Sequence, residues 1–219
     1  MLRNYLILTF RNLRKRATIS IINILGLSLG VSVSILLLFY VFQEYSFDSF
    51  HTNKNSIYRA WSHEDYGNDE IYWGTITPII LKDKLDEELP EVLLSCRRVM
   101  YEDEVQYSNG AKRIKSEIQF CDKEFFQIFD FTLLRGNKDQ VFKNKESLVL
   151  NERTAKDLFG NLNIIGEELE IKIADKFKTF IVSGIIEDAP ANSSISYEIL
   201  IPFENAREMY RESNFNSSL

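Results

Sequence analysis

Residues 19–42 read ISIINILGLSLGVSVSILLLFYVF, a run of 24 residues without a charged side chain. As an α-helix this run is about 36 Å long, which is enough to cross a bilayer with some tilt. Sixteen of its side chains are Leu, Ile, Val or Phe. At about 0.3 to 0.6 kcal/mol each, these side chains favour insertion by roughly 5 to 10 kcal/mol. The stretch therefore predicts one transmembrane helix.

A secretory signal peptide is the competing interpretation of this stretch. The apolar core of a signal peptide is about 7 to 15 residues long and is followed by a small-x-small cleavage site. Residues 43–50 read QEYSFDSF and contain no such site. We therefore expect the helix to remain in the mature protein.

Charge is distributed unevenly about the predicted span. Five basic residues precede it and are the predicted topogenic charges: Arg3, Arg11, Arg14, Lys15 and Arg16. Residues 1–43 contain no acid and carry +5, so the net charge of −6 leaves −11 for residues 44–219. The positive-inside rule predicts a cytoplasmic N-terminus and an extracytoplasmic location for residues 43–219. An acidic body of this kind repels nucleic acid.

Residues 1–18 form a second membrane feature, a basic amphipathic segment on the cytoplasmic side. Leu2, Leu6, Phe10 and Leu13 recur at helical spacing among the basic residues. This pattern indicates a helix lying in the interface of the bilayer. The alternative is a basic flank that sets the topology without forming a helix.

Within the span, Gly26, Gly30 and Ser34 recur every four residues and share one face of the predicted helix, flanked by Ser28 and Ser32. A strip of small residues lets another helix approach closely, with dispersion contacts and serine hydrogen bonds between the two. We predict a helix-packing face here. The alternative is the general abundance of small residues in membrane helices.

Residues 43–219 contain apolar runs of strand length, turn residues and a few short amphipathic helices. The predicted strands cover 57–64, 92–107, 112–120, 147–150, 168–173, 179–187 and 195–201. Because strands and helices follow no regular order, the pattern favours an α+β fold. The predicted organisation is a segment at 1–18, a transmembrane helix at 19–42 and one domain at 43–219.

Three helices in this domain are marked by residues typical of helix ends. Thr77 is the predicted N-cap of a helix that begins at Pro78, and Asp122 is the predicted N-cap of KEFFQIF. Asn151 is the predicted N-cap of ERTAKDLF, which ends at Gly160. The apolar side chains of these helices are expected to form core rather than a ligand site.

The sequence predicts no catalytic residue, no metal site and no cofactor. His51 and His63 are its only histidines, and it has no phosphate-binding loop. The acidic clusters at 86–88 and 102–104 are expected to be solvated surface, with cation binding as the alternative. Cys96 and Cys121 lack metal spacing and are either separate buried residues or, in an oxidising compartment, a disulfide.

A series of phrases resembles the N-terminal region of MacB/FtsX-type permeases of bacterial ABC transporters. The phrases occur in the family order from the N-terminus to residue 194: NYL with FRNL and IINILGL, FDSFH with IYR, LPEV, FFQIFDF with LRG, AKDLFG with IG, VSGI, and PANSS. Each phrase is weak alone, but their order makes the resemblance specific.

This resemblance implies a MacB-like periplasmic core domain at 43–219 in the bacterial inner membrane. It also implies a dimeric permease, either a homodimer or a heterodimer, with a cytoplasmic ATPase subunit and possible contact with a periplasmic adaptor. The family permease has no catalytic residues, so none is carried over. The expected role is export or lipoprotein and peptide handling.

The sequence stops at Leu219 without the later membrane helices of the family, so we expect a fragment or a truncated gene product. The alternative is a complete single-span protein that anchors a periplasmic sensor or interaction module. A downstream reading frame with further spans of about 20 apolar residues would favour the permease.

Overall fold

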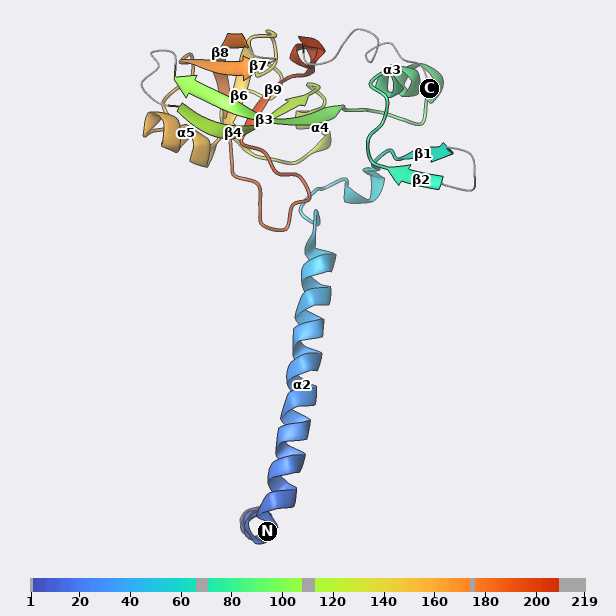
Figure 1. Ribbon diagram of the computed structural model, residues 1–219, viewed down its shortest axis with the longest axis vertical. Helices are drawn as coiled ribbons and strands as arrows, with labels where there is room; N and C mark the ends of the chain where they lie inside the picture. The colour runs from blue at the N-terminus through green and yellow to red at the C-terminus, as the bar shows by residue number, and fades with distance from the viewer. Residues whose placement is uncertain (1, 66–70, 108–112, 174–175, 209–219) are drawn as a thin grey trace. The chain divides into compact units, whose positions relative to one another are not determined.

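The computed structural model describes residues 2–65, 71–107, 113–173 and 176–208. The chain divides into two units, Met1–Ser49 and Phe50–Leu219. The first unit consists of α1 (Leu2–Lys15) and α2 (Ala17–Ser46). The helix α1 confirms that residues 1–18 contain a helix, as predicted. None of the residues of α2 is buried, and the helix is long and apolar enough to cross a membrane (Figure 1).

The second unit is built on strands. A hairpin pairs β1 (Ser62–Asp65) with β2 (Ile71–Gly74). The main sheet has seven strands: β3 (Arg98–Tyr107), β4 (Arg113–Cys121), β5 (Leu133–Arg135), β6 (Ser147–Asn151), β7 (Glu168–Ile173), β8 (Lys176–Ile186) and β9 (Ile199–Pro202). The helices are α3 (Leu81–Glu88), α4 (Phe125–Ile128) and α5 (Glu152–Phe159), with 3₁₀ turns at Lys54–Ser56 and Phe203–Glu208.

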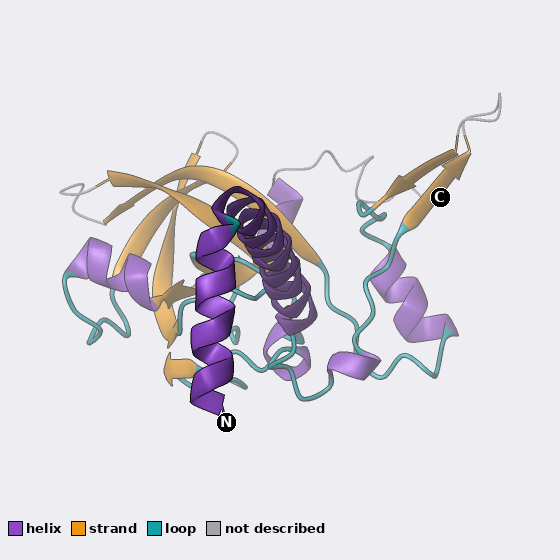
Figure 2. Cartoon of the chain, turned by 90° about the horizontal axis from the view of Figure 1, so that it is seen from below, coloured by secondary structure: helices purple, strands orange, loops and turns teal. Residues whose placement is uncertain are grey.

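The main sheet closes on itself. Its strand order is β5-β8-β6-β9-β4-β3-β7, and β7 pairs with β8 as well as with β3. The first half of β8 pairs with β7, from Lys176 opposite Ile173 to Ile181 opposite Glu168, and the second half pairs with β6 and β5. The ring mixes parallel pairs, β4–β9 and β6–β8, with antiparallel ones, and Figure 2 shows its strands as a curved layer.

Alternate residues of these strands supply two separate cores, as expected for a sheet that is covered on both faces. One core takes Phe120, Leu150 and Ile199 from the strands, together with Ala155 and Leu158 of α5. The other takes the intervening residues, among them Val149 and Leu200. This second core is closed by aromatic side chains of the segments between strands: Phe125, Phe126, Phe131 and Tyr197. The predicted α+β class is correct.

The helix α5 confirms the local prediction for its two ends. The side chain of Asn151 accepts a hydrogen bond of 2.8 Å from the backbone N–H of Thr154. Gly160 adopts the left-handed conformation, with φ +74°, that ends a helix without a Cβ clash. Both residues act on neighbours in the sequence, so local chemistry was sufficient to predict them.

The other two predicted N-caps are wrong. The helix α3 begins at Leu81, because residues 78–81 first form a tight turn in which the N–H of Leu81 donates to the carbonyl of Pro78. Thr77 therefore lies outside the helix. The short helix α4 begins at Phe125 without a side-chain cap, because the carboxylate of Asp122 is bound to Arg97 instead.

Several strand boundaries also differ from the prediction. Residues 57–61 are not a strand, and β1 begins at Ser62. The strand β3 begins at Arg98 rather than at residue 92, because its partner β4 ends opposite it at Cys121. Likewise β9 begins at Ile199, not at residue 195. The strands β2 and β5 were not predicted, and residue 112 lies outside the described residues.

Candidate functional site

The predicted packing face of α2 is a shallow groove on the helix. Gly26, Gly30 and Ser34 line it together with Ile22, Asn23, Leu27, Val31 and Ile35. Apart from the neighbouring backbone of α2, a Cβ atom placed on Gly26 or on Gly30 would meet no atom within 4 Å. The hydroxyl of Ser34 donates to the carbonyl of Gly30 at 2.9 Å, and Ser32 donates to the carbonyl of Ser28 at 2.7 Å. Because these protons are used within α2, close approach rather than serine donation is what the groove offers a second helix.

The predicted topogenic charges lie at and before the start of α2. Arg11, Arg14 and Lys15 are exposed on α1, and Arg16 is the residue between the two helices. The side chain of Arg3 lies outside the described residues. The four basic side chains that the structure describes are therefore exposed at the start of the span.

The chain enters the second unit through a buried histidine that the sequence did not single out as functional. His51 is only 3% exposed, and its ring contacts those of Phe50, Phe129 and Phe131 at centroid distances of 4.1, 5.4 and 5.2 Å. Its Nδ1 accepts a 3.1 Å hydrogen bond from the N–H of Asp130, so the neutral ring carries its proton on Nε2. The Nε2 atom is buried and has no partner among the described residues.

The residue after His51, Thr52, is bound to the same segment. The backbone N–H of Thr52 donates to the carboxylate of Asp130, and the Phe50 ring lies 5.7 Å from that of Phe131. The segment 50–52 is thus fixed to the segment 129–131 by two hydrogen bonds and an aromatic cluster. We call this arrangement the root. Its signal in the sequence was the phrase FDSFH, which marks the position but not the contacts.

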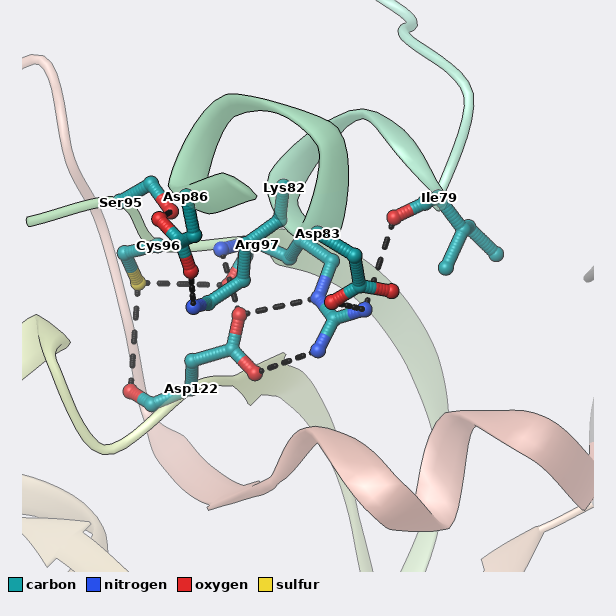
Figure 3. A network of polar contacts seen from close by, with 8 residues as sticks. All are labelled: Ile79, Lys82, Asp83, Asp86, Ser95, Cys96, Arg97 and Asp122. Atoms are coloured by element: carbon teal, nitrogen blue, oxygen red, sulfur yellow. Dashed lines mark hydrogen bonds and ion pairs between the residues drawn. The ribbon is translucent and has the colours of Figure 1, made fainter. Parts of the chain in front are cut away.

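A second polar site joins α3 to the main sheet, and Figure 3 shows its side chains. Arg97 makes a two-point ion pair with Asp122, with Nε–Oδ2 and Nη2–Oδ1 distances of 3.0 Å. The N–H of Arg97 donates to the same carboxylate at 2.8 Å, and the guanidinium stacks on the ring of Phe203 at 4.2 Å. Two-point pairs of this kind are both directional and strong.

The segment around α3 approaches the same arginine. A guanidinium nitrogen of Arg97 lies 3.5 Å from the carbonyl oxygen of Ile79 and 3.8 Å from the carboxylate of Asp83. Within this segment, Asp86 accepts from Lys82 at 2.6 Å and from Ser95 at 2.5 Å (Figure 3). These hydrogen bonds, that from Lys82 first, lower the pKa of Asp86. We call the contacts around Arg97 and Asp122 the arginine junction.

The two cysteines lie near this junction as free thiols. Cys121 is fully buried opposite Arg98, and Cys96 donates weakly to the carbonyl of Arg97 at 3.4 Å. Burial, followed by the charge of Asp122, raises the pKa of Cys96 to about 12, and burial raises that of Cys121 as well. Burial therefore favours the protonated thiol over the thiolate in both residues.

A polar cavity of about 320 Å³ lies beside the segment that joins β8 to β9. Acidic side chains that line this cavity accept hydrogen bonds from other residues of the domain. The carboxylate of Glu198 accepts from the hydroxyl of Ser116 at 2.7 Å and from the N–H of Glu117 at 2.9 Å. Asp188 accepts from the N–H of Arg153 at 3.1 Å. The described residues include no group of three His, Cys, Asp or Glu side chains able to hold a metal ion.

The predicted acidic clusters also lack the features of a cation site where the structure describes them. In the 86–88 cluster, Asp86 is engaged by Lys82 and Ser95, and Lys84 lies 3.9 Å from Glu87 and 3.4 Å from Glu88. The side chains of the 102–104 cluster lie outside the described residues. The polar sites among the described residues are therefore attachment sites between segments of the domain.

Comparison with known proteins relates this chain to membrane permeases. The family model described as "MacB-like periplasmic core domain" matches residues 20–218. A search of curated proteins gives no match. A solved domain assigned to a permease of Porphyromonas gingivalis is 19% identical, with a TM-score of 0.59 over 73% of this chain and 65% of that one. This likeness supports the same fold.

Two further solved structures are more distant. The periplasmic region of MacB from Actinobacillus actinomycetemcomitans is 16% identical, with a TM-score of 0.48 over 67% of this chain and 64% of that one. The extracellular domain of the ABC-type transporter YknZ from Gram-positive bacteria is 11% identical, with a TM-score of 0.44 over 57% of this chain and 64% of that one. The chain thus spans less than two thirds of each of the three solved chains.

Proposed function

The chain belongs to the family of MacB-like periplasmic core domains, and on that premise we propose that it couples a cytoplasmic ATPase to an extracytoplasmic domain within a bacterial ABC transporter. In this proposal the chain is the N-terminal part of the permease subunit. The work of the transporter is export or the handling of lipoproteins or peptides. ATP is hydrolysed by a separate subunit.

The observation that carries the proposal is the short covalent path from α2 to the root. The helix α2 ends at Ser46, and Phe50, the first residue of the root, follows after only three residues. Four Cα steps reach at most about 14 Å, so a displacement of the outer end of α2 is passed on with little slack. The contacts of His51 and Thr52 with Asp130 then carry it into the aromatic core of the sheet.

The arginine junction extends this path to the segment around α3. Because Arg97 holds both Asp122 and the carbonyl of Ile79, the hairpin and α3 are not joined to the main sheet by the chain alone. A load applied to either part is shared through a two-point ion pair, which is stiffer than a single hydrogen bond.

The path itself is tested by lengthening it. A flexible Gly-Ser insertion between Ser49 and Phe50, in the complete permease that carries this chain, adds slack without touching the root. We expect assembly and membrane insertion to persist while transport and its stimulation of ATP hydrolysis fall. The matched control is the same insertion after the exposed Lys138. Equal activity of the two insertion variants would contradict the coupling role.

Orientation is a separate part of the proposal. The basic residues Arg11, Arg14, Lys15 and Arg16, with Arg3, hold the N-terminus in the cytoplasm, and residues 43–219 lie in the periplasm. Single cysteines at the exposed positions Asn4 and Lys138, with Cys96 and Cys121 changed to Ser, test it with an impermeant maleimide on intact spheroplasts. We expect labelling at position 138 and protection at position 4. The reverse pattern would overturn the topology.

The proposed partners are an ATPase subunit, a second permease subunit, the lipid bilayer and a periplasmic adaptor. Gly26, Gly30 and Ser34 are the proposed contact with another membrane helix. Gly26→Ile with Gly30→Ile fills the groove and should weaken helix association by about 1 kcal/mol or more, measured by energy transfer in bilayers. Leu29→Ile is the control, and unchanged assembly of the glycine variant would remove the packing face.

The ATPase is tested by purifying the complete gene product from membranes and asking which proteins accompany it. We expect an ABC ATPase at a fixed ratio. A complete single-span protein, active without an ATPase, would instead establish the anchored sensor or interaction module as the function.

A further inference from the structure

The helix α1 lies across the axis of α2 rather than in line with it. Arg16, the single residue between the two helices, has φ −120° and ψ 51°, which is not a helical conformation, so the chain turns there. Figure 1 views α1 end on at the foot of α2, and Figure 2, after a turn of 90°, shows α1 along its length. Where α2 crosses a bilayer, α1 therefore lies along the membrane surface.

The bases of this unit gather on one side of α1 and at its junction with α2. Arg11, Arg14 and Lys15 are spaced i, i+3 and i+4, so they share one face of the helix. Their side chains and that of Arg16 are exposed. The apolar residues recur at spacings of four and three and occupy positions on another face: Leu2, Leu6, Phe10 and Leu13. The helix is thus basic on one side and apolar on another, as in helices that bind a membrane interface.

The first unit holds no carboxylate close to these bases. The first acid in the sequence is Glu44, 28 residues after Arg16. At 1.5 Å per residue this is about 42 Å along α2, well beyond the roughly 8 Å over which exposed charges interact in physiological salt. The start of α2 has no side-chain cap, so the positive end of its dipole adds to the same charge. The basic face is therefore left for a partner outside this unit to neutralise.

The two faces of α1 together select the occupant. An apolar face is satisfied by hydrocarbon and a basic face by anions, and a bilayer that contains anionic phospholipid offers both at one surface. Guanidinium groups also pair with phosphate oxygens at two points, which favours headgroup phosphates over weakly structured counterions. An acidic groove on a protein would satisfy both faces as well. Only the bilayer, however, is already beside α1 through the covalent link to α2.

We infer that α1 and the first residues of α2 form a docking surface for anionic phospholipid headgroups, with Arg11, Arg14, Lys15 and Arg16 as the headgroup contacts. The apolar face enters the boundary between headgroups and acyl chains, and the basic side chains extend to the phosphate oxygens. This inference rests on the part of the proposed function that places α2 across a bilayer. It requires neither an ATPase nor a particular side of the membrane.

Hydrogen exchange of the α1 amides tests this contact without a label. A free helix of 14 residues is marginal in water, so its amides are protected only where a surface holds the helix. The full chain is reconstituted in nanodiscs of phosphatidylcholine alone and in nanodiscs that also contain phosphatidylglycerol. Exchange is read from peptide fragments that cover α1, and fragments of α2 report on the same discs whether the span is inserted.

We expect α1 to be protected more strongly in the anionic discs, and the difference to shrink as salt is raised. Arg11→Gln, Arg14→Gln and Lys15→Gln, combined in a triple variant, keep the helix propensity almost unchanged. The triple variant should lower the protection of α1 in anionic discs roughly fivefold for each base removed. Leu13→Gln should lower it in both kinds of disc, because the apolar contact does not depend on the headgroup.

The matched control removes the same number of charges from exposed positions of the second unit, with Lys123→Gln, Lys138→Gln and Lys143→Gln. It should leave the protection of α1 unchanged. Equal protection of α1 in both kinds of disc would overturn the preference for anionic headgroups. Equal protection in the triple variant and its control would place the lipid contact elsewhere.

Two further results would overturn the inference for different reasons. Protection of α1 that arises only after an ATPase subunit is added would assign the surface to a protein partner. Rapid exchange throughout α2 would show that the span itself is not inserted, and the proposed function would fail together with the inference. Protection of α2 without lipid-dependent protection of α1 leaves the span intact and removes the inference alone.

Discussion

The helix α2 and the strand β6 are both rich in apolar side chains, but only β6 finds its contacts within the chain. All five residues of β6 are buried, between α5 on one face and the aromatic core on the other. The thirty residues of α2 include none that is buried. An apolar sequence predicts only that its side chains are removed from water. Its structural role depends on whether protein or lipid covers those side chains. For β6 the cover is the protein, whereas α2 must take its cover from lipid or from other helices.

The largest expected effect contrasts one residue type in the two regions. Phe131 is 1% exposed and contacts Phe125 and Tyr197, so Phe131→Ala should lower the unfolding free energy by about 3 to 5 kcal/mol. Phe42 on α2 is 69% exposed, and Phe42→Ala should change the unfolding free energy by less than about 0.5 kcal/mol. The measurement is the urea concentration at which the buried Cys121 becomes reactive.

Phe131→Leu, a milder variant, keeps this test usable if Phe131→Ala does not fold. Equal shifts in the urea midpoint for positions 131 and 42 would break the comparison. They would mean that α2 is part of the same folding unit as the sheet.

A charge placed in α2 tests the membrane side of the comparison. Leu29 lies near the middle of the span, and Leu29→Arg should disfavour membrane insertion by about 3 kcal/mol. The fraction of the chain that resists alkaline extraction from membranes measures this loss. Ile181→Arg, on the half-exposed outer face of β8, should leave that fraction unchanged. Normal membrane integration of Leu29→Arg would mean that α2 is not the anchor.

Adding a single methyl group to a glycine in each region, Gly184 in β8 and Gly30 in α2, extends the comparison. A Cβ on Gly184 would lie 2.8 Å from a methyl carbon of Val141 and 3.3 Å from one of Val149, so Gly184→Ala should cost about 1 to 3 kcal/mol of unfolding free energy. Gly30→Ala meets open space and should cost the domain nothing. Thermal denaturation of both variants checks this, and a stable Gly184→Ala would show that β8 has room to shift.

The smallest expected effect extends the comparison to charged groups. Arg97→Met removes the two-point pair with Asp122, and the side chains of this pair are 24% and 11% exposed. Because the pair is partly exposed, its loss should cost about 1 to 2 kcal/mol. Lys84→Met removes pairs with the exposed Glu87 and Glu88 and should change stability by less than about 0.5 kcal/mol. A double-mutant cycle with Asp122→Asn isolates the pair, and a coupling energy near zero would contradict its role.

Local chemistry explains which parts of the fold could be predicted. The caps of α5 involve residues within one or two turns of each other, and β7 was predicted with its observed bounds because its apolar residues alternate. Asp122 was predicted as a cap because it precedes an apolar segment, but Arg97, 25 residues earlier, binds it more strongly. The root was missed for the same reason, since His51 and Asp130 are 79 residues apart in the sequence.

The sequence by itself determined the uncharged span, the sign of the charge on each side of it and the ends of α5. Each of these follows from residues adjacent along the chain, whose energies do not depend on the fold. Only the tertiary structure decided which aromatic side chains are core and which are surface, and that β7 closes the sheet against β8. Those outcomes depend on which distant segments meet, because burial and pairing are properties of contacts rather than of residue types.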